Sequence, residues 1–153
     1  MSAVLKLEHA FRPMQMQDLD AVMAIEDVIY THPWSRGNFS DSLNAGYSCW
    51  VLEEGETMLG YAVMMLVMDE SHLLNLSIAR EFQGCGYGRA LLEKMKELAR
   101  RHGAVNMFLE VRVSNRTAIS LYEKAGFNEM AIRRKYYPSH VGREDAVLMG
   151  AAL

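Results

Sequence analysis

The chain contains little cysteine and proline, has no long apolar run and carries no excess of positive charge. Its 153 residues include two cysteines and three prolines, and two cysteines are too few for the disulfide framework of a small secreted domain. The longest apolar candidate, Tyr61–Met68, is far shorter than the ~20 residues that a membrane-spanning helix needs. We therefore expect neither a disulfide scaffold nor a membrane protein.

Charge and histidine spacing exclude two further classes of protein. A formal net charge of −3 and a pI near 5.9 argue against a nucleic-acid-binding domain, which is normally strongly basic. The five histidines lie apart from one another and from Cys49 and Cys85, without the C-x-x-C or H-x-x-x-H spacing of metal sites. The start of the chain lacks the basic and apolar regions of a secretory signal. We expect a cytoplasmic protein with free thiols, no metal and no direct contact with nucleic acid.

What the sequence does contain is the patterning of one α/β domain over residues 1–153. This length allows a substantial core, and no linker, repeat or biased segment divides the chain. Alternating or apolar runs predict strands at 5–14, within 47–68 as a hairpin that turns at Glu54–Glu56, at 72–79, at 106–113, at 128–138 and at 143–153. Helical spacing predicts helices from Gln17 or Asp18, around 39–43, from the glycines to Gly103, and from Ser114 or Asn115 to Gly126. The expected fold is a mixed sheet of about seven strands flanked by helices.

Three glycines, Gly84, Gly86 and Gly88, separate the apolar strand at 72–79 from the long amphipathic helix. Glycine lowers stability wherever another residue would serve, and unpaired N–H groups at a helix N-terminus attract anions. The loop lacks the lysine and hydroxyl residue of a nucleoside-triphosphate loop, and it lacks the third glycine of a dinucleotide fingerprint. It is either a site for another anion or a turn with a purely structural purpose.

The segment QGCGYG at Gln83–Gly88, after the strand LLNLSIA, resembles the pyrophosphate loop of the GCN5-related N-acetyltransferase (GNAT) family. The resemblance implies a sheet whose fourth and fifth strands splay apart, with the pantetheine of acetyl-CoA bonded along the fourth strand. It implies that acetyl-CoA is the co-substrate and that these residues bind it: Leu76, Ser77, Ile78, Gly84, Cys85, Gly86, Tyr87, Gly88, Arg89 and Asn115. Cys85 stands where relatives often carry a basic residue, which predicts one fewer phosphate contact. For Asn115, helix capping is an equally reasonable role.

Two polar residues stand in apolar surroundings near the end of the chain. Glu110 interrupts the strand at 106–113, and Tyr122 follows on the next helix; from the residues alone, a solvated carboxylate and a packed ring are the simpler interpretations. The segments LEVRVSN and AISLYEKAGF, however, resemble those of the ribosomal-protein-alanine acetyltransferases, the bacterial RimI type. The resemblance implies that Glu110 is the general base, acting through water, and that Tyr122 is the acid toward the CoA thiolate. It also places residues 32–34 and 136–138 beside the peptide groove.

The resemblance implies a protein N-terminus as acceptor, with the N-terminal alanine of small-subunit ribosomal protein eighteen as the specific candidate. The reference pKa values of an α-amine, about 7.8, and of lysine, about 10.4, differ by about 3.5 kcal/mol of deprotonation free energy, which favours the terminus. Burial can offset that difference for a lysine. The alternatives are therefore a GNAT enzyme acting on lysine side chains or small amines, a non-catalytic acyl-CoA sensor and, more remotely, a nucleotide-binding module.

Overall fold

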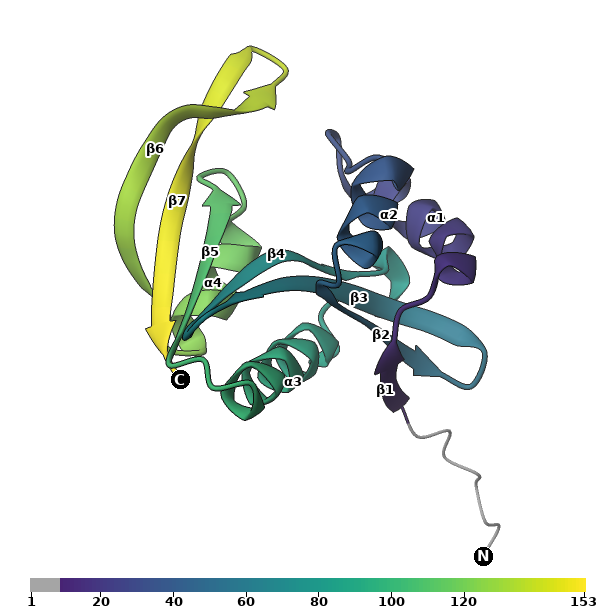
Figure 1. Cartoon of the computed structure of the whole chain (residues 1–153). Helices are drawn as coiled ribbons and strands as arrows, with labels where there is room; N and C mark the ends of the chain where they lie inside the picture. Colours follow the sequence, from purple (N-terminus) through teal and green to yellow (C-terminus); the bar gives the residue numbers. More distant parts are fainter. Residues whose placement is uncertain (1–8) are drawn as a thin grey trace, which may run out of the picture.

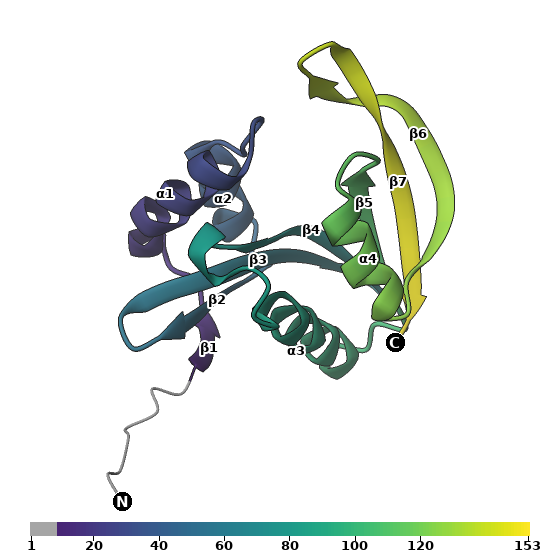
Figure 2. The same ribbon diagram turned by 180° about the vertical axis from the view of Figure 1, so that it is seen from behind.

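The computed structural model describes residues 9–153, which form one mixed sheet with helices on both of its faces (Figure 1, Figure 2). The strands are β1 (His9–Pro13), β2 (Ser48–Glu54), β3 (Thr57–Val67), β4 (Glu70–Ile78), β5 (Asn106–Arg112), β6 (Asn128–Ser139) and β7 (Gly142–Ala152). The helices are α1 (Leu19–Ile29), α2 (Arg36–Asn44), α3 (Tyr87–Arg101) and α4 (Arg116–Lys124), with short 3-10 turns η1 (Met16–Asp18) and η2 (Arg80–Phe82). The predicted α/β class is confirmed; the part of the first predicted strand at residues 5–8 lies outside the described residues.

The seven strands lie in the order β1-β2-β3-β4-β5-β7-β6, and every neighbouring pair is antiparallel except β4 with β5. The apolar strand β4 is central, as its composition predicted. It pairs with β5 only along Glu70–Leu73, which faces Asn106–Leu109. Beyond Leu73 and Leu109 the two strands separate, so the predicted splay is confirmed.

Helices α1 and α2 cover one face of the sheet, while α3 and α4 cover the other (Figure 1, Figure 2). The first face holds a cluster of buried side chains around Phe39 and Tyr61. The second holds the larger cluster, in which Leu91 and Met95 of α3 meet Met107 of β5. Each such buried side chain contributes about 1.5 to 3 kcal/mol to stability, and together they hold the start of α3 against the end of β4.

Helix α2 is longer than the expected 39–43 because Ser35 caps it. The Ser35 hydroxyl accepts a hydrogen bond from the Asn38 N–H at 3.1 Å, and the Asn38 side chain accepts one from the Ser35 N–H at 2.9 Å. This reciprocal capping box satisfies two backbone donors and starts the helix at Arg36. The loop between α1 and α2, residues 30–35, is consequently short and fixed at both ends.

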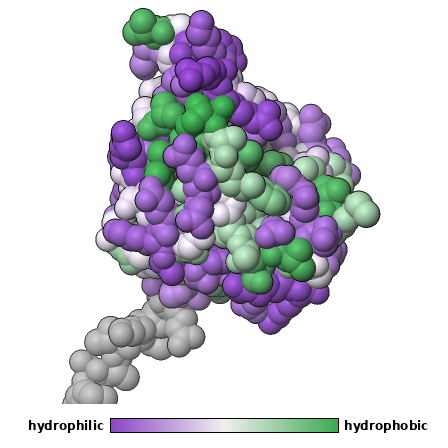
Figure 3. All heavy atoms as spheres, turned by 90° about the vertical axis from the view of Figure 1, so that its left-hand side faces the viewer, coloured by the Kyte–Doolittle hydropathy of each residue, from purple (hydrophilic) through white to green (hydrophobic). Residues whose placement is uncertain are grey.

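The long β6–β7 hairpin forms one side of the molecule and curves over the end of β5 (Figure 1). Its outer face mixes hydrophilic with hydrophobic side chains (Figure 3). The exposed apolar residues of the hairpin include Met130 and Ile132. At its tip, the His140 ring lies 5.8 Å from the His32 ring, measured between centroids. The hairpin therefore reaches the α1–α2 loop on the far side of the splayed strands. Among residues 9–153, no helix is both long and apolar enough to cross a bilayer.

Candidate active site

A cleft opens where β4 and β5 separate, and two adjoining cavities make it up. The glycine-loop cavity, about 600 Å³, lies toward the start of α3; the hairpin cavity, about 620 Å³, lies toward the α1–α2 loop and the β6–β7 hairpin. Both cavities are lined by the same central residues: Tyr30, Thr31, His32, Leu76, Arg112, Asn115, Ala118 and Tyr122. The two cavities therefore adjoin at these residues, and two ligands entering from the two ends of the cleft would meet at this junction.

The glycine loop has the geometry of an anion cradle. Gly84 and Gly86 adopt left-handed φ angles of +76° and +88°, which L side chains rarely adopt, and Gly86 directly precedes α3. Gly88 has no such φ, and among residues 9–153 a Cβ there would meet only Leu121 and Ile78, at ordinary contact distances of 3.5 and 3.8 Å. The protein's own packing therefore does not require a glycine at 88. Its missing side chain leaves free space in the glycine-loop cavity, as the binding of a ligand beside the helix N-terminus would require.

Eight of the ten residues predicted to bind acetyl-CoA line this cavity: Leu76, Ser77, Ile78, Gly84, Gly86, Gly88, Arg89 and Asn115. Cys85 and Tyr87 do not. The Cys85 thiol is exposed and points back to the Gln83 carbonyl, 3.6 Å away. The Tyr87 ring turns to the other side of the loop, where it packs edge-on against His9 at 5.7 Å. These two residues can therefore serve a ligand in this cavity only through their backbone.

The cavity offers both positive charge and unpaired backbone. Arg89 lies in the first turn of α3, where its Nε pairs with Glu93 Oε1 at 3.2 Å, and the helix N-terminus adds about 0.3 to 1 kcal/mol of attraction for an anion. Beyond Leu73, no strand within residues 9–153 pairs with β4 on its β5 side. The backbone of Leu76–Ile78 thus presents a free edge to which an extended amide-containing group can bond as an added strand.

Glu110 lies on β5 just past the point of separation, in the wall of the hairpin cavity. Its side chain is 24% exposed, and Oε1 forms an ion pair with Arg133 Nε of β6 at 3.0 Å. It shares the cavity wall with Trp34 and Tyr137. A carboxylate at the edge of a cleft, accessible to water on one side, is placed to take up a proton from a group bound there.

Tyr122 reaches the junction of both cavities from α4. It is only 8% exposed, and burial, reinforced by the nearby Tyr30 and Tyr137, raises its pKa above the ordinary value near 10. The phenol therefore keeps its proton at neutral pH. Tyr122 can act there as a proton donor, while the proton acceptor Glu110 lines the adjoining hairpin cavity.

Two residues around the junction fix other parts of the cleft. The Asn115 side chain accepts from the Ala118 N–H at 3.2 Å, so it caps α4 while also lining both cavities. Arg112 joins Glu144 of β7 through a 3.0 Å ion pair, and its guanidinium lies 4.6 Å from the centre of the Tyr137 ring. Arg112 thereby anchors the hairpin to β5. Within residues 9–153, no three potential metal ligands come together.

The sequence did not single out a buried polar network beside the hairpin cavity. Glu26 of α1 is 1% exposed and accepts from the Trp34 N–H at 2.9 Å, the Tyr61 hydroxyl at 2.7 Å and the Asn75 amide at 3.4 Å. Burial raises the pKa of this carboxyl, although the three donors oppose the shift. One signal was available, because Glu26 follows Val22 by four positions and so falls on the buried face of its helix. Nothing in the local sequence pointed to Tyr30, whose hydroxyl lies 2.6 Å from Ser77 Oγ.

Comparison with known proteins agrees with this geometry. Residues 19–127 match the model of the acetyltransferase (GNAT) family. The chain is 40% identical over 136 residues to the ribosomal protein bS18-alanine N-acetyltransferase of Escherichia coli K12, covering 89% of this chain and 92% of that protein. It is 39% identical to the Haemophilus influenzae enzyme of that name, covering 89% of this chain and 93% of that protein. The crystal structure of the Escherichia coli ribosomal-protein-S18-alanine N-acetyltransferase superposes with a TM-score of 0.89 at 37% identity, covering 95% and 94% of the two chains. This chain therefore belongs to the GNAT family of acetyltransferases.

Proposed function

We propose that the protein transfers the acetyl group of acetyl-CoA to the N-terminal α-amine of a protein, specifically to the N-terminal alanine of ribosomal protein bS18. The observation that carries this proposal is the 40% identity to the Escherichia coli enzyme across 92% of its length. The two adjoining cavities support it, because a donor at the glycine loop and an acceptor under the hairpin would meet beside Tyr122, with Glu110 in the wall of the hairpin cavity.

The glycine-loop cavity suits the CoA portion. The backbone N–H groups of 84–88 and the Arg89 side chain would bind the pyrophosphate, and the free edge of β4 at Leu76–Ile78 would bond the pantetheine amides. Acetyl-CoA supplies an activated thioester carbonyl, and a β4 backbone N–H at this edge would stabilise negative charge developing on its oxygen. Cys85 offers no charge to the phosphates, so Arg89 and the loop amides supply the attraction.

Glu110 and Tyr122 divide the two proton transfers. The amine must be neutral to attack, and Glu110, reached through water, takes the proton that the nitrogen releases as the N–C bond forms. As the C–S bond breaks, the sulfur gains a proton from Tyr122, whose raised pKa keeps that proton available at neutral pH. The acetyl group is not attached covalently to the protein at any step, because the new bond forms directly between the bound amine and the carbonyl carbon.

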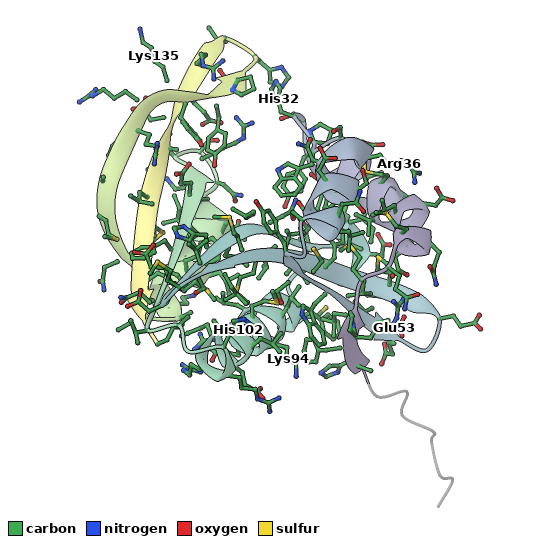
Figure 4. All side chains as sticks on the ribbon, viewed as in Figure 1. His32, Arg36, Glu53, Lys94, His102 and Lys135 are labelled. Atoms are coloured by element: carbon green, nitrogen blue, oxygen red, sulfur yellow. The ribbon has the colours of Figure 1, made fainter. Side chains whose placement is uncertain are left out.

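The contact between the α1–α2 loop and the hairpin tip favours a chain end as acceptor. His32 lies in the wall of the cleft and reaches toward the hairpin, with its ring 5.8 Å from that of His140 (Figure 4). A free N-terminus carries chain in one direction only and can enter beneath this contact. An internal lysine carries backbone on both sides of its side chain, and that backbone would meet the two loops.

A thiol-release assay with acetyl-CoA tests the proposal. Two peptides share one sequence beginning with the first residues of the acceptor protein: one has a free N-terminal alanine, and the other is blocked at the terminus and carries one lysine. We expect CoA release with the free terminus alone, and mass spectrometry should place the acetyl group on the α-nitrogen. Release with the lysine peptide alone would assign the cleft to side-chain amines instead. Binding of acetyl-CoA without release from either peptide or from bS18 would favour a sensor.

A further inference from the structure

A chain of buried hydrogen bonds connects Glu26 to the junction of the two cavities. The Ser77 hydroxyl donates to the Asn75 carbonyl oxygen at 2.6 Å, and the Tyr30 hydroxyl lies 2.6 Å from Ser77 Oγ. Asn75 in turn donates to Glu26 at 3.4 Å. Asn75 and Ser77 are 9% and 2% exposed. Neither the capping of helices nor the proposed base and acid makes use of this chain of groups.

The direction of the hydrogen bonds follows from Glu26. Three donors converge on its two oxygens, and one of them, the Trp34 N–H, cannot reverse its role, so the arrangement fits a carboxylate that only accepts. The Asn75 amide nitrogen must then face Glu26, which turns the Asn75 oxygen toward Ser77. The Ser77 hydrogen is committed to that oxygen, so Tyr30 must be the donor in its bond to Ser77.

Tyr30 therefore offers the cleft an acceptor and no hydrogen. The other atom near its hydroxyl, the Leu76 carbonyl oxygen at 3.5 Å, is also an acceptor, which leaves the same conclusion. Burial raises the pKa of Tyr30 to about 12, so the phenol is neutral at physiological pH. Tyr30 lines both cavities and is close enough to Tyr122 to raise its pKa. Tyr30 thus lies where the two cavities adjoin, which is where the two substrates would meet.

We propose that Tyr30 is a further catalytic residue, whose oxygen accepts a hydrogen bond from the attacking amine and is oriented for this by Ser77, Asn75 and Glu26. This inference rests on the proposed function. A neutral primary amine has one lone pair and two hydrogens. One N–H bonds the water that leads to Glu110 and later releases its proton there; the other bonds Tyr30, which exchanges no proton. With both hydrogens held, the lone pair points at the thioester carbon.

An acceptor with a single N–H separates this role from a structural one. The Tyr30→Phe variant and the wild type are each assayed with an alanine-terminated peptide and with the same peptide bearing N-methylalanine, whose neutral amine has one hydrogen. We expect Tyr30→Phe to lower kcat/KM about tenfold on the alanine peptide, equivalent to about 1.4 kcal/mol, and by less than about twofold on the N-methyl peptide. The KM for acetyl-CoA should not change. Partial unfolding would lower both rates by the same factor, so the ratio is insensitive to it.

A double-mutant cycle on the alanine peptide tests the same role of Tyr30 without the N-methyl peptide. If Ser77 acts by orienting the Tyr30 hydroxyl, Ser77→Ala lowers kcat/KM, yet the double variant is no slower than Tyr30→Phe alone. Tyr47→Phe is the matched control, because Tyr47 packs against the α1–α2 side of the sheet and lies outside the lining of both cavities. Equal losses on both peptides, or fully multiplicative effects in the cycle, would overturn the proposed role of Tyr30 but not the proposed function. Failure of the wild type to acetylate the alanine peptide would overturn the proposed function and this inference with it.

Discussion

Replacing Gly60 of β3 with alanine should disturb the free edge of β4, because β3 pairs with the opposite edge of that strand. Gly60 of β3 faces Ile78, and a Cβ there would lie 2.4 Å from the Ser77 carbonyl oxygen and 2.6 Å from Ile78 Cδ1. Carbon contacts are most favourable at about 3.5 to 4.0 Å, so these neighbours must move by about 1 Å. The Ile78 side chain can rotate, but the Ser77 oxygen belongs to the backbone, and β4 itself must shift. Overpacking of this kind costs about 1 to 3 kcal/mol, which corresponds to about 2 to 12 °C in Tm for a chain of this size.

The same shift should weaken catalysis, because Ser77 and Ile78 belong to the edge proposed to hold the pantetheine. A misplacement of about 1 Å can cost about 10²-fold in rate. Thermal unfolding and thiol release are measured for Gly60→Ala beside Gly37→Ala, the same substitution in α2, where the new Cβ would meet only Ser35 Oγ at 3.6 Å. Alanine should stabilise that helix by about 0.5 to 1 kcal/mol. A Gly60→Ala protein with unchanged Tm and rate would refute the packing argument and the placement of the cofactor edge.

Three other predictions follow from the site and the core. Glu110→Gln and Tyr122→Phe should each lower kcat by about 10² to 10⁴-fold while the Kd for CoA, measured by calorimetry, stays unchanged; equal loss of CoA binding would contradict their assignment. Arg12 donates to both oxygens of Asp18 at 2.8 Å and lowers the pKa of this carboxyl. In urea unfolding, the wild type should therefore be more stable than Asp18→Asn above the unfolded pKa of about 3.9. This advantage should vanish as pH falls through the lower folded pKa. A constant advantage down to about pH 2 would exclude the ion pair as its source. Lys96, 7% exposed, donates to a carbonyl at the end of α4 at 3.0 Å; Lys96→Met should lower the free energy of unfolding by about 1 to 3 kcal/mol, and no loss would mean that water replaces the ammonium.

The features that the sequence predicted well are those with a local cause. Glycines with positive φ marked the turn before α3 and the end of α4 at Gly126, and apolar periodicity located the central strand and the long helix. The boundary of α2 was missed by three residues because its capping box, Ser35 with Asn38, lacks the acidic partner that usually reveals one. Local patterns therefore located the elements, and their ends were accurate where a glycine fixed them.

Contacts between distant segments were not predictable from local patterns. Glu26 is bound by Tyr61 and Asn75, which are 35 and 49 positions further along the chain, and the ion pair of Glu110 with Arg133 joins two strands separated by β7 in the sheet. A carboxylate in an apolar helical stripe signals that partners exist without naming them. The roles of Glu110 and Tyr122 came from family resemblance, since their own surroundings were equally compatible with a solvated and a packed side chain.

The register of β4 gives a physical cause for the cleft itself. Along β3, Val63 faces Asn75 and Met64 faces Leu73, so Leu74 is an extra residue without a partner. Such a bulge increases the twist of its strand, and the last pair that β4 makes with β5 is Leu73 with Leu109, immediately before the bulge. The strand therefore turns away from β5 where its register slips. One inserted residue thus frees the edge at Leu76–Ile78 for a ligand and, by the same rotation, directs Asn75 and Ser77 toward α1, where Glu26 and Tyr30 complete the polar chain.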